Sequence, residues 1–156
     1  MSRYRATLEY FGKPFVGWQR QKNGFSVQQA LEEAIKNFCG QDVVTYVAGR
    51  TDAGVHALGQ VCHFEIEKKE TTKTIRNAIN FHLKPNPIIV LNVVEVEETF
   101  HARFSAKERH YLYKFINRAT PSALYSDLSW WVPQALDIDL MKEASKCLIG
   151  KHDFST

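Results

Sequence analysis

The chain has 156 residues, of which 44% are hydrophobic and 24% charged, and its formal net charge is +3. This composition is typical of a folded globular domain and excludes an intrinsically disordered chain. The three cysteines lack disulfide or metal-ligand spacing, which indicates a reducing compartment. Because no apolar run approaches a membrane span and the N-terminus lacks a signal-peptide core, we expect a cytoplasmic protein without a membrane partner.

Two segments carry more positive charge than the chain as a whole. Residues 11–25 contain three basic and no acidic side chains, and residues 101–118 contain five basic side chains and one acidic one. Both segments also contain several aromatic residues. Basic and aromatic side chains together suit a polyanion with stackable bases. The alternative interpretation is a solvated strand face beside core aromatics.

The first predicted elements are a strand, a long loop and a helix. Alternation of polar and apolar residues predicts the strand over residues 3–10, and glycines and a proline predict the loop over 11–25. Ser26 is the expected N-cap of the helix, with Gln29 three residues later as its capping-box partner. Gly40 is the expected end of this helix.

Five further elements follow in chain order. The pattern predicts a strand, a loop, a strand, a helix and a strand, over residues 42–48, 49–57, 59–66, 72–83 and 88–96. The resulting order β-α-β-β-α-β predicts an α+β fold of the ferredoxin-like kind, an antiparallel sheet with two helices on one face. We assign this unit to residues 1–98. Since RNA-binding modules and unrelated enzymes both use this fold, the fold alone does not settle the function.

Residues 99–156 are predicted to begin a second unit of the same kind. A strand is expected over 109–116, followed by an irregular segment over 117–136. Asp137 is the expected N-cap of a third helix, and Gly150 is its expected end.

The loop from Gly49 to His56 concentrates residues that can carry chemistry. It brings Arg50, Asp52 and His56 within seven residues. A neighbouring arginine favours an ionised carboxylate, which can act as a nucleophile or as a base. The alternative is an ordinary connection between strands, in which Thr51 and Asp52 hydrogen-bond to the turn backbone.

Other chemistries fit the sequence poorly. No P-loop or dinucleotide-binding fingerprint is present. Strand alternation would separate His56, Cys62 and His63, and no fourth ligand stands nearby, so we expect no metal site. Cys62 lies in the middle of a predicted strand, where a catalytic thiol would lack access. The Asp-Ala-Gly triplet also differs from the Asp-Thr-Gly or Asp-Ser-Gly of retroviral-type aspartic proteases.

Four ordered sequence blocks carry a family resemblance. They are Tyr10–Gly12 with Gly17–Gln21 and Ser26–Gln28, then Gly49–Ala57, then Phe100–Ala106 with Arg109 and Tyr111–Tyr113, and finally Gly150–Phe154. Together these blocks resemble the TruA-type tRNA pseudouridine synthases, and they extend over essentially the whole chain.

The resemblance implies the pseudouridine-synthase fold and the isomerisation of uridine to pseudouridine in the anticodon stem-loop of tRNA, at positions 38–40 in the family. It also implies a homodimer that binds tRNA and uses no cofactor and no metal. Asp52 corresponds to the family's catalytic aspartate, and Tyr111 to its substrate-binding tyrosine. Three roles stay open for Asp52: attack on the sugar, attack on the base, or removal of the C2′ proton.

The roles expected for the basic residues are less specific. Arg50 is a candidate for filling the space of the flipped base or holding a phosphate, and the alternative is a structural ion pair. By position and charge, the candidate tRNA contacts are Arg20, Lys22, Arg103 and Arg109. Since the family's chains continue past the last residue here, we expect a member truncated at its C-terminus.

Two functions compete with the family's activity. A non-catalytic ferredoxin-like RNA-binding module would explain the basic and aromatic segments but would leave the Arg50–Asp52 triplet without a role. A small-molecule enzyme such as a phosphatase would need a glycine-rich anion loop before a helix, and the sequence contains none.

Overall fold

The computed structural model describes residues 1–154, which fall into two compact units, one over Met1–Arg109 and the other from His110 onward. The functional division predicted between residues 98 and 99 stays a prediction. Within the described residues, no helix is long and apolar enough to cross a bilayer.

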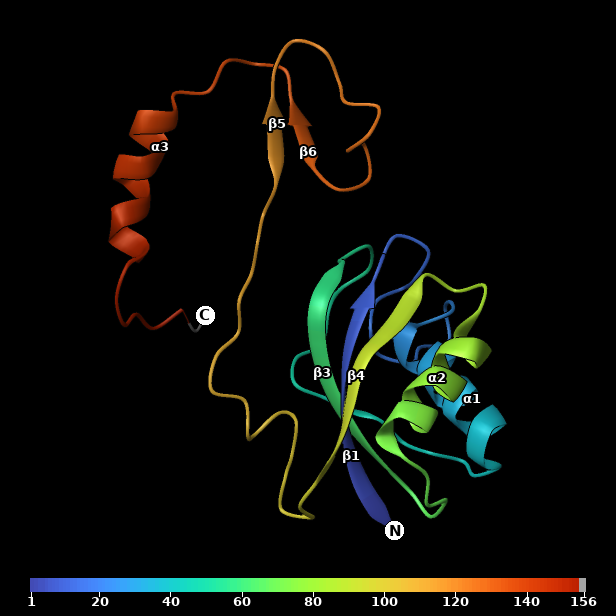
Figure 1. The fold of residues 1–156 in the computed structure, drawn as a ribbon. Helices are drawn as coiled ribbons and strands as arrows, with labels where there is room; N and C mark the ends of the chain where they lie inside the picture. The colour runs from blue at the N-terminus through green and yellow to red at the C-terminus, as the bar shows by residue number, and fades with distance from the viewer. Residues whose placement is uncertain (155–156) are drawn as a thin grey trace. The chain divides into compact units, whose positions relative to one another are not determined.

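The first unit contains four strands and two helices. They are β1 (Ser2–Tyr10), α1 (Val27–Cys39), β2 (Tyr46–Val47), β3 (Ala57–Ile66), α2 (Thr72–Leu83) and β4 (Ile88–Val96). The strands form one antiparallel sheet in the order β2-β3-β1-β4, and both helices lie on the same face of it (Figure 1). The predicted α+β class and the ferredoxin-like β-α-β-β-α-β order are therefore confirmed.

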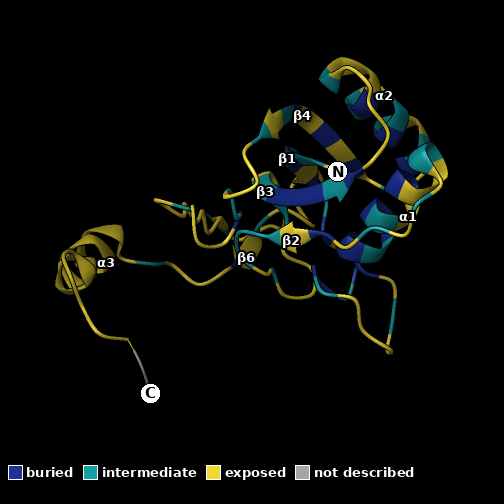
Figure 2. Cartoon of the chain, turned by 90° about the horizontal axis from the view of Figure 1, so that it is seen from below, coloured by how far each residue is buried: buried dark blue, intermediate teal, exposed yellow. Residues whose placement is uncertain are grey.

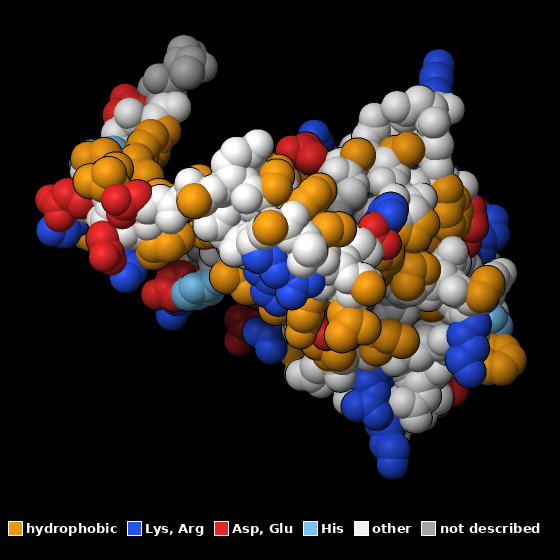
Figure 3. All heavy atoms as spheres, turned by 90° about the horizontal axis from the view of Figure 1, so that it is seen from above, with side chains coloured by type: hydrophobic (Ala, Val, Ile, Leu, Met, Phe, Trp, Pro, Cys, Tyr) orange, Lys and Arg blue, Asp and Glu red, His pale blue; other side chains and the backbone are white. Residues whose placement is uncertain are grey.

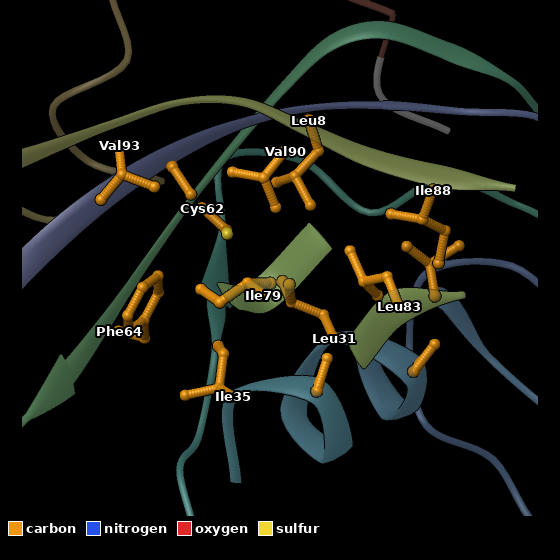
Figure 4. Packing of buried hydrophobic residues seen from close by; sticks show 14 of the residues in the cluster. Leu8, Leu31, Ile35, Cys62, Phe64, Ile79, Leu83, Ile88, Val90 and Val93 are labelled. Atoms are coloured by element: carbon orange, nitrogen blue, oxygen red, sulfur yellow. The ribbon is translucent and has the colours of Figure 1, made fainter. Parts of the chain in front are cut away.

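The core of this unit lies between the sheet and the two helices. From the sheet, Leu8 and Val90 point toward Leu31 of α1 and toward Ile79 of α2 (Figure 4). All four side chains are at most 1% exposed. Because α1 and α2 each bury one apolar stripe, the periodicity of the sequence predicts both helices well.

Helix α1 begins and ends as predicted, with one difference at its start. The hydroxyl of Ser26 accepts a hydrogen bond from the Gln29 amide over 3.1 Å, and Gly40 ends the helix with φ 77°. The Gln29 side chain, however, donates to Glu33 Oε1 one turn further on. Only one half of the predicted capping box is formed.

The strand predicted over residues 42–48 is reduced to Tyr46–Val47. The residue just before it is held by helix α1, because the Thr45 amide donates to Glu32 Oε1 over 2.9 Å and the Thr45 carbonyl accepts from Gln28 Nε2. Side chains of α1 thus take the backbone groups that a longer strand would use in the sheet.

The face of the sheet opposite the helices is crossed by the segment that follows β4. Arg3 donates to the carbonyl oxygens of Glu98 and Phe100, and the Ala102 amide donates to Nδ1 of the buried His63 over 3.1 Å. The His63 ring also stacks on Tyr46 at a centroid distance of 5.0 Å. This segment belongs to the resemblance block at residues 100–106.

The second unit contains β5 (Phe115–Asn117), β6 (Trp130–Val132), α3 (Ile138–Ser145) and a short 3-10 turn, Lys146–Leu148. Strands β5 and β6 pair in parallel. The prediction of a strand over 109–116 is wrong for residues 109–114. These residues pair with no other strand within residues 1–154. The prediction of an irregular segment over 117–136 is wrong for Trp130–Val132, because these residues form β6 and pair with β5.

Asp137 caps α3 as predicted, since its carboxylate accepts from the amides of Asp139 and Leu140. The helix ends at Ser145, earlier than Gly150, and is followed by the 3-10 turn. Its apolar stripe is exposed, as the yellow colour of α3 in Figure 2 shows.

Candidate active site

The segment Gly49–Ala57, here called the Asp52 loop, connects β2 to β3. At the start of the loop, the Gly49 carbonyl oxygen accepts a hydrogen bond from Gln60 Nε2 over 2.8 Å. A turn closes where the Val55 amide donates to the Asp52 carbonyl over 3.2 Å, and Gly54 adopts φ 78° inside this turn. Asp52 is exposed.

Thr51 attaches the loop to two other parts of the first unit. Its carbonyl oxygen accepts from the Trp18 amide over 2.9 Å, and its hydroxyl lies 2.8 Å from the Tyr10 hydroxyl. Trp18 and Tyr10 are almost completely buried, and burial raises the pKa of the Tyr10 phenol above its usual value. Thr51, the residue next to Asp52, is therefore held by the backbone of one buried core residue and by the side chain of another.

Two glycines allow the loop over residues 11–25 to approach the Asp52 loop closely. A Cβ atom on Gly17 would lie 2.7 Å from the Thr51 carbonyl oxygen, and Gly17 has φ 109°. A Cβ atom on Gly12 would collide with the Val55 carbonyl. At Gly17 the close approach is combined with a positive φ, which only glycine adopts readily.

His56 connects the far end of the Asp52 loop to the end of β1. Its Nδ1 accepts from the Gly12 amide over 3.0 Å, and its ring lies against Phe11 at a centroid distance of 4.6 Å. His56 therefore holds the loop backbone in place.

A hollow of about 540 Å³ lies beside Asp52. Residues 50–53 form one wall of this hollow, and the other wall is formed by Val16, Gln19, Gln21 and Asn23. Its volume is within the range of small-ligand sites. Arg50 and Asp52 thus lie at one hollow, but residues 1–154 contain no ion pair between Asp52 and a basic side chain.

The four candidate tRNA contacts differ in their surroundings. Arg20 forms an ion pair with Glu32 at 3.0 Å, and Arg109 Nη2 donates to the Ala48 carbonyl over 2.9 Å. The guanidinium of Arg103 lies over the Phe104 ring, and Lys22 is exposed in the loop over residues 11–25. On the face drawn in Figure 3, basic side chains are scattered among hydrophobic ones.

Tyr111 belongs to the second unit. It lies in a segment without regular secondary structure, and 86% of its surface is exposed. Its proximity to Asp52 stays a prediction.

Sequence reasoning assigned no role to several residues that form or support the hollow, foremost Gln19 and Gln28. Both belong to the resemblance blocks, which is the signal that could have identified them. Within residues 1–154, no three His, Cys, Asp or Glu side chains gather closely enough to hold a metal ion.

Comparison with known proteins now identifies the class. The family model described as tRNA pseudouridine synthase matches residues 6–105, which include both walls of the hollow. The chain belongs to the tRNA pseudouridine synthase family.

Particular relatives share this class and carry the name tRNA pseudouridine synthase A. The chain is 52% identical over 156 residues to the protein of Parvibaculum lavamentivorans and 54% identical over 155 residues to that of Wolbachia pipientis wMel. It is 51% identical over 156 residues to the protein of Paramagnetospirillum magneticum. These alignments cover 99–100% of this chain and 61–63% of the relatives, so the chain spans less than two thirds of their length.

Proposed function

We propose that the protein isomerises uridine to pseudouridine in the anticodon stem-loop of tRNA, with Asp52 as the catalytic residue. The observation that carries the proposal is the position of this carboxylate at the edge of a hollow large enough for a nucleoside, on a loop held by Thr51. Family membership supports the reaction class.

The reaction requires cleavage of the C1′–N1 bond, rotation of the uracil and formation of a bond from C1′ to C5. An ionised carboxylate suits attack on the sugar, attack on the base or removal of the C2′ proton. The target uridine must leave its stack to reach Asp52. In this proposal, Tyr111 stacks on the flipped uracil, and Arg50 occupies the vacated space or holds a phosphate.

The proposal extends to the partners that the family resemblance implies. The protein acts in the cytoplasm as a homodimer on tRNA, and Lys22, Arg103 and Arg109 contact the RNA backbone. Arg20 contributes a phosphate contact with the guanidinium donors that Glu32 does not occupy.

The test follows the hydrogen on C5 of uracil, which bond formation at C5 must expel. The protein, purified as its source expresses it, is mixed with tRNA that carries tritium at uracil C5. We expect release of tritium into water at the anticodon-arm uridines. Binding of tRNA without tritium release would instead support a non-catalytic RNA-binding module.

A further inference from the structure

A buried polar network joins helix α1 to the hollow beside Asp52. Its centre is Gln28, which is 8% exposed. Gln28 Oε1 accepts from Gln19 Nε2 over 2.9 Å and from the Arg20 amide over 3.1 Å. Gln28 Nε2 donates to Glu32 Oε1 over 2.9 Å and to the Thr45 carbonyl over 3.2 Å.

The partners of Gln28 fix which way its amide faces. A backbone N–H can only donate, so the Arg20 amide must meet the oxygen of Gln28. A carboxylate and a carbonyl can only accept, so Glu32 and Thr45 must meet its nitrogen. A reversed amide would place like groups together on both sides and leave buried polar groups unpaired.

The orientation of Gln28 in turn determines that of Gln19. Since Gln28 presents its oxygen, Gln19 must present its NH₂ group to it. Two hydrogen-bonding groups of the Gln19 amide then remain for a ligand, the carbonyl oxygen and the second N–H of its NH₂ group. Gln19 lines the hollow together with Asp52. The network therefore fixes the Gln19 carbonyl oxygen as an acceptor in a residue that lines the hollow, with the second N–H beside it.

An acceptor at this place discriminates between the pyrimidines. Uracil carries a hydrogen-bond donor at N3, whereas cytosine carries an acceptor at N3. A fixed carbonyl oxygen pairs with the first and is repelled by the second, and a site built on a hydrogen bond rejects the analogue that lacks it. Because the network holds Gln19 through Gln28, the amide cannot exchange the positions of its oxygen and its NH₂ group to match the edge of cytosine without breaking the hydrogen bond to Gln28.

From this geometry we infer that Gln19 is a specificity residue that accepts a hydrogen bond from N3–H of the target uracil, and that Gln28 and Glu32 are its positioning residues. The inference rests on the proposed function and adds the group that reads the base. Glu32 contributes by holding Gln28 and by its ion pair with Arg20 at 3.0 Å.

The experiment compares two anticodon-arm RNA hairpins that differ only at the target, one with uridine as substrate and one with cytidine as competitive inhibitor. The readout is the ratio of the Ki of the cytidine hairpin to the KM of the uridine hairpin. In the wild-type protein this ratio should exceed one. In Gln19→Leu we expect KM for uridine to rise about three- to tenfold, the value of one neutral hydrogen bond, and the ratio to fall toward one.

Two further variants separate specificity from structure. Gln28→Leu should lower the ratio as Gln19→Leu does, although Gln28 does not contact the RNA, and thermal unfolding checks that it stays folded. If Gln28→Leu is unfolded, the result for Gln19→Leu alone tests the inference. The matched control is Gln29→Leu, since Gln29 follows Gln28 on helix α1 but is not among the residues that line the hollow, and its side chain bonds to the exposed Glu33 rather than to the network. Its ratio should stay at the wild-type value.

A ratio that is unchanged in Gln19→Leu, or that falls equally in Gln29→Leu, would overturn the inference. A merely structural role would weaken both hairpins together and leave the ratio constant, which would also overturn it. Absence of tritium release by the wild-type protein would contradict the proposed function itself. Tritium release with an unmoved ratio would contradict only the role of Gln19.

Discussion

The backbone N–H of Trp18 donates a hydrogen bond of 2.9 Å to the carbonyl oxygen of Thr51, the residue immediately before Asp52. Trp18 is 1% exposed and therefore rigidly packed. The same segment continues into Gln19, which forms the opposite wall of the hollow. One hydrogen bond thus connects the carboxylate that we propose to be catalytic with the wall that we propose to read the base.

Asp52→Asn should abolish turnover while the affinity for tRNA changes by no more than a few-fold. The amide is nearly isosteric with the carboxylate but is neither a nucleophile nor a base at neutral pH. Tritium release measures turnover, and filter binding measures affinity. Asp42→Asn is the control, since Asp42 is an exposed aspartate that pairs with Lys36 on the surface. Multiple turnover by Asp52→Asn would remove Asp52 from the mechanism.

Gly17→Ala should destabilise the fold and lower activity. Positive φ at a non-glycine residue costs about 1–3 kcal/mol, and the added Cβ would also press on the Thr51 carbonyl and displace the Asp52 loop. Gly40→Ala is a matched control, because Gly40 also has positive φ, but a Cβ there would meet no atom of the described residues within 4 Å. Urea unfolding measures stability, and tritium release measures activity. Both should fall in Gly17→Ala, whereas only stability should fall in Gly40→Ala. Full activity of Gly17→Ala would argue against the importance of this close approach.

Tyr111→Phe should preserve most tRNA binding and strongly lower the rate. Phenylalanine keeps the stacking face, worth about 1–3 kcal/mol per base, and loses only the hydroxyl, which can move a proton. Tyr111→Ala, which removes both the stacking face and the hydroxyl, is the comparison. If Tyr111→Phe is fully active while Tyr111→Ala is inactive, the residue is a stacking platform without a role in proton transfer.

Stability should decrease as the pH falls from 6.5 toward 4 because of His63. Burial, followed by the neighbouring charges of His101 and Arg3, lowers the pKa of His63 to about 4 in the folded state. The unfolded chain binds a proton near pH 6.5, so the contribution of His63 is complete above this pH and is lost as the pH falls through the window. Thermal unfolding at several pH values measures the effect.

The control for this prediction is His63→Gln, which keeps a hydrogen-bond acceptor for the Ala102 amide but does not titrate. Its stability should change less with pH than that of the wild-type protein. Parallel pH profiles for the two proteins would show that His63 is not the responsible group.

Binding of tRNA should weaken steeply with salt, because the basic residues of the first unit would neutralise phosphates. Each phosphate contact adds about 0.7–0.9 to the slope of log K against log salt. Arg103→Gln should therefore reduce the slope by about this amount. Arg76→Gln on helix α2 is the control, since Arg76 lies outside both basic segments and bonds to Asn77. A slope near zero would contradict a tRNA-facing surface over residues 11–25 and 101–118.

Local patterns in the sequence determined most of the first unit. Helix α2 and strand β4 have the predicted bounds, because each carries a regular apolar repeat and is followed or preceded by a clear stop signal. The position of Asp52 on a loop between two strands likewise follows from its glycine-flanked motif. Such features depend on residues that are neighbours in the chain, so periodicity and turn chemistry suffice to predict them.

Tertiary structure decided the features that depend on partners distant in sequence. Strand β2 is short because Gln28 and Glu32 hold Thr45, and β6 forms because β5 lies beside it. The orientation of the Gln19 amide follows from Gln28, Glu32 and Thr45 together. Hydrogen-bond satisfaction is a property of groups that meet only after folding, so no local pattern in the sequence could specify these outcomes.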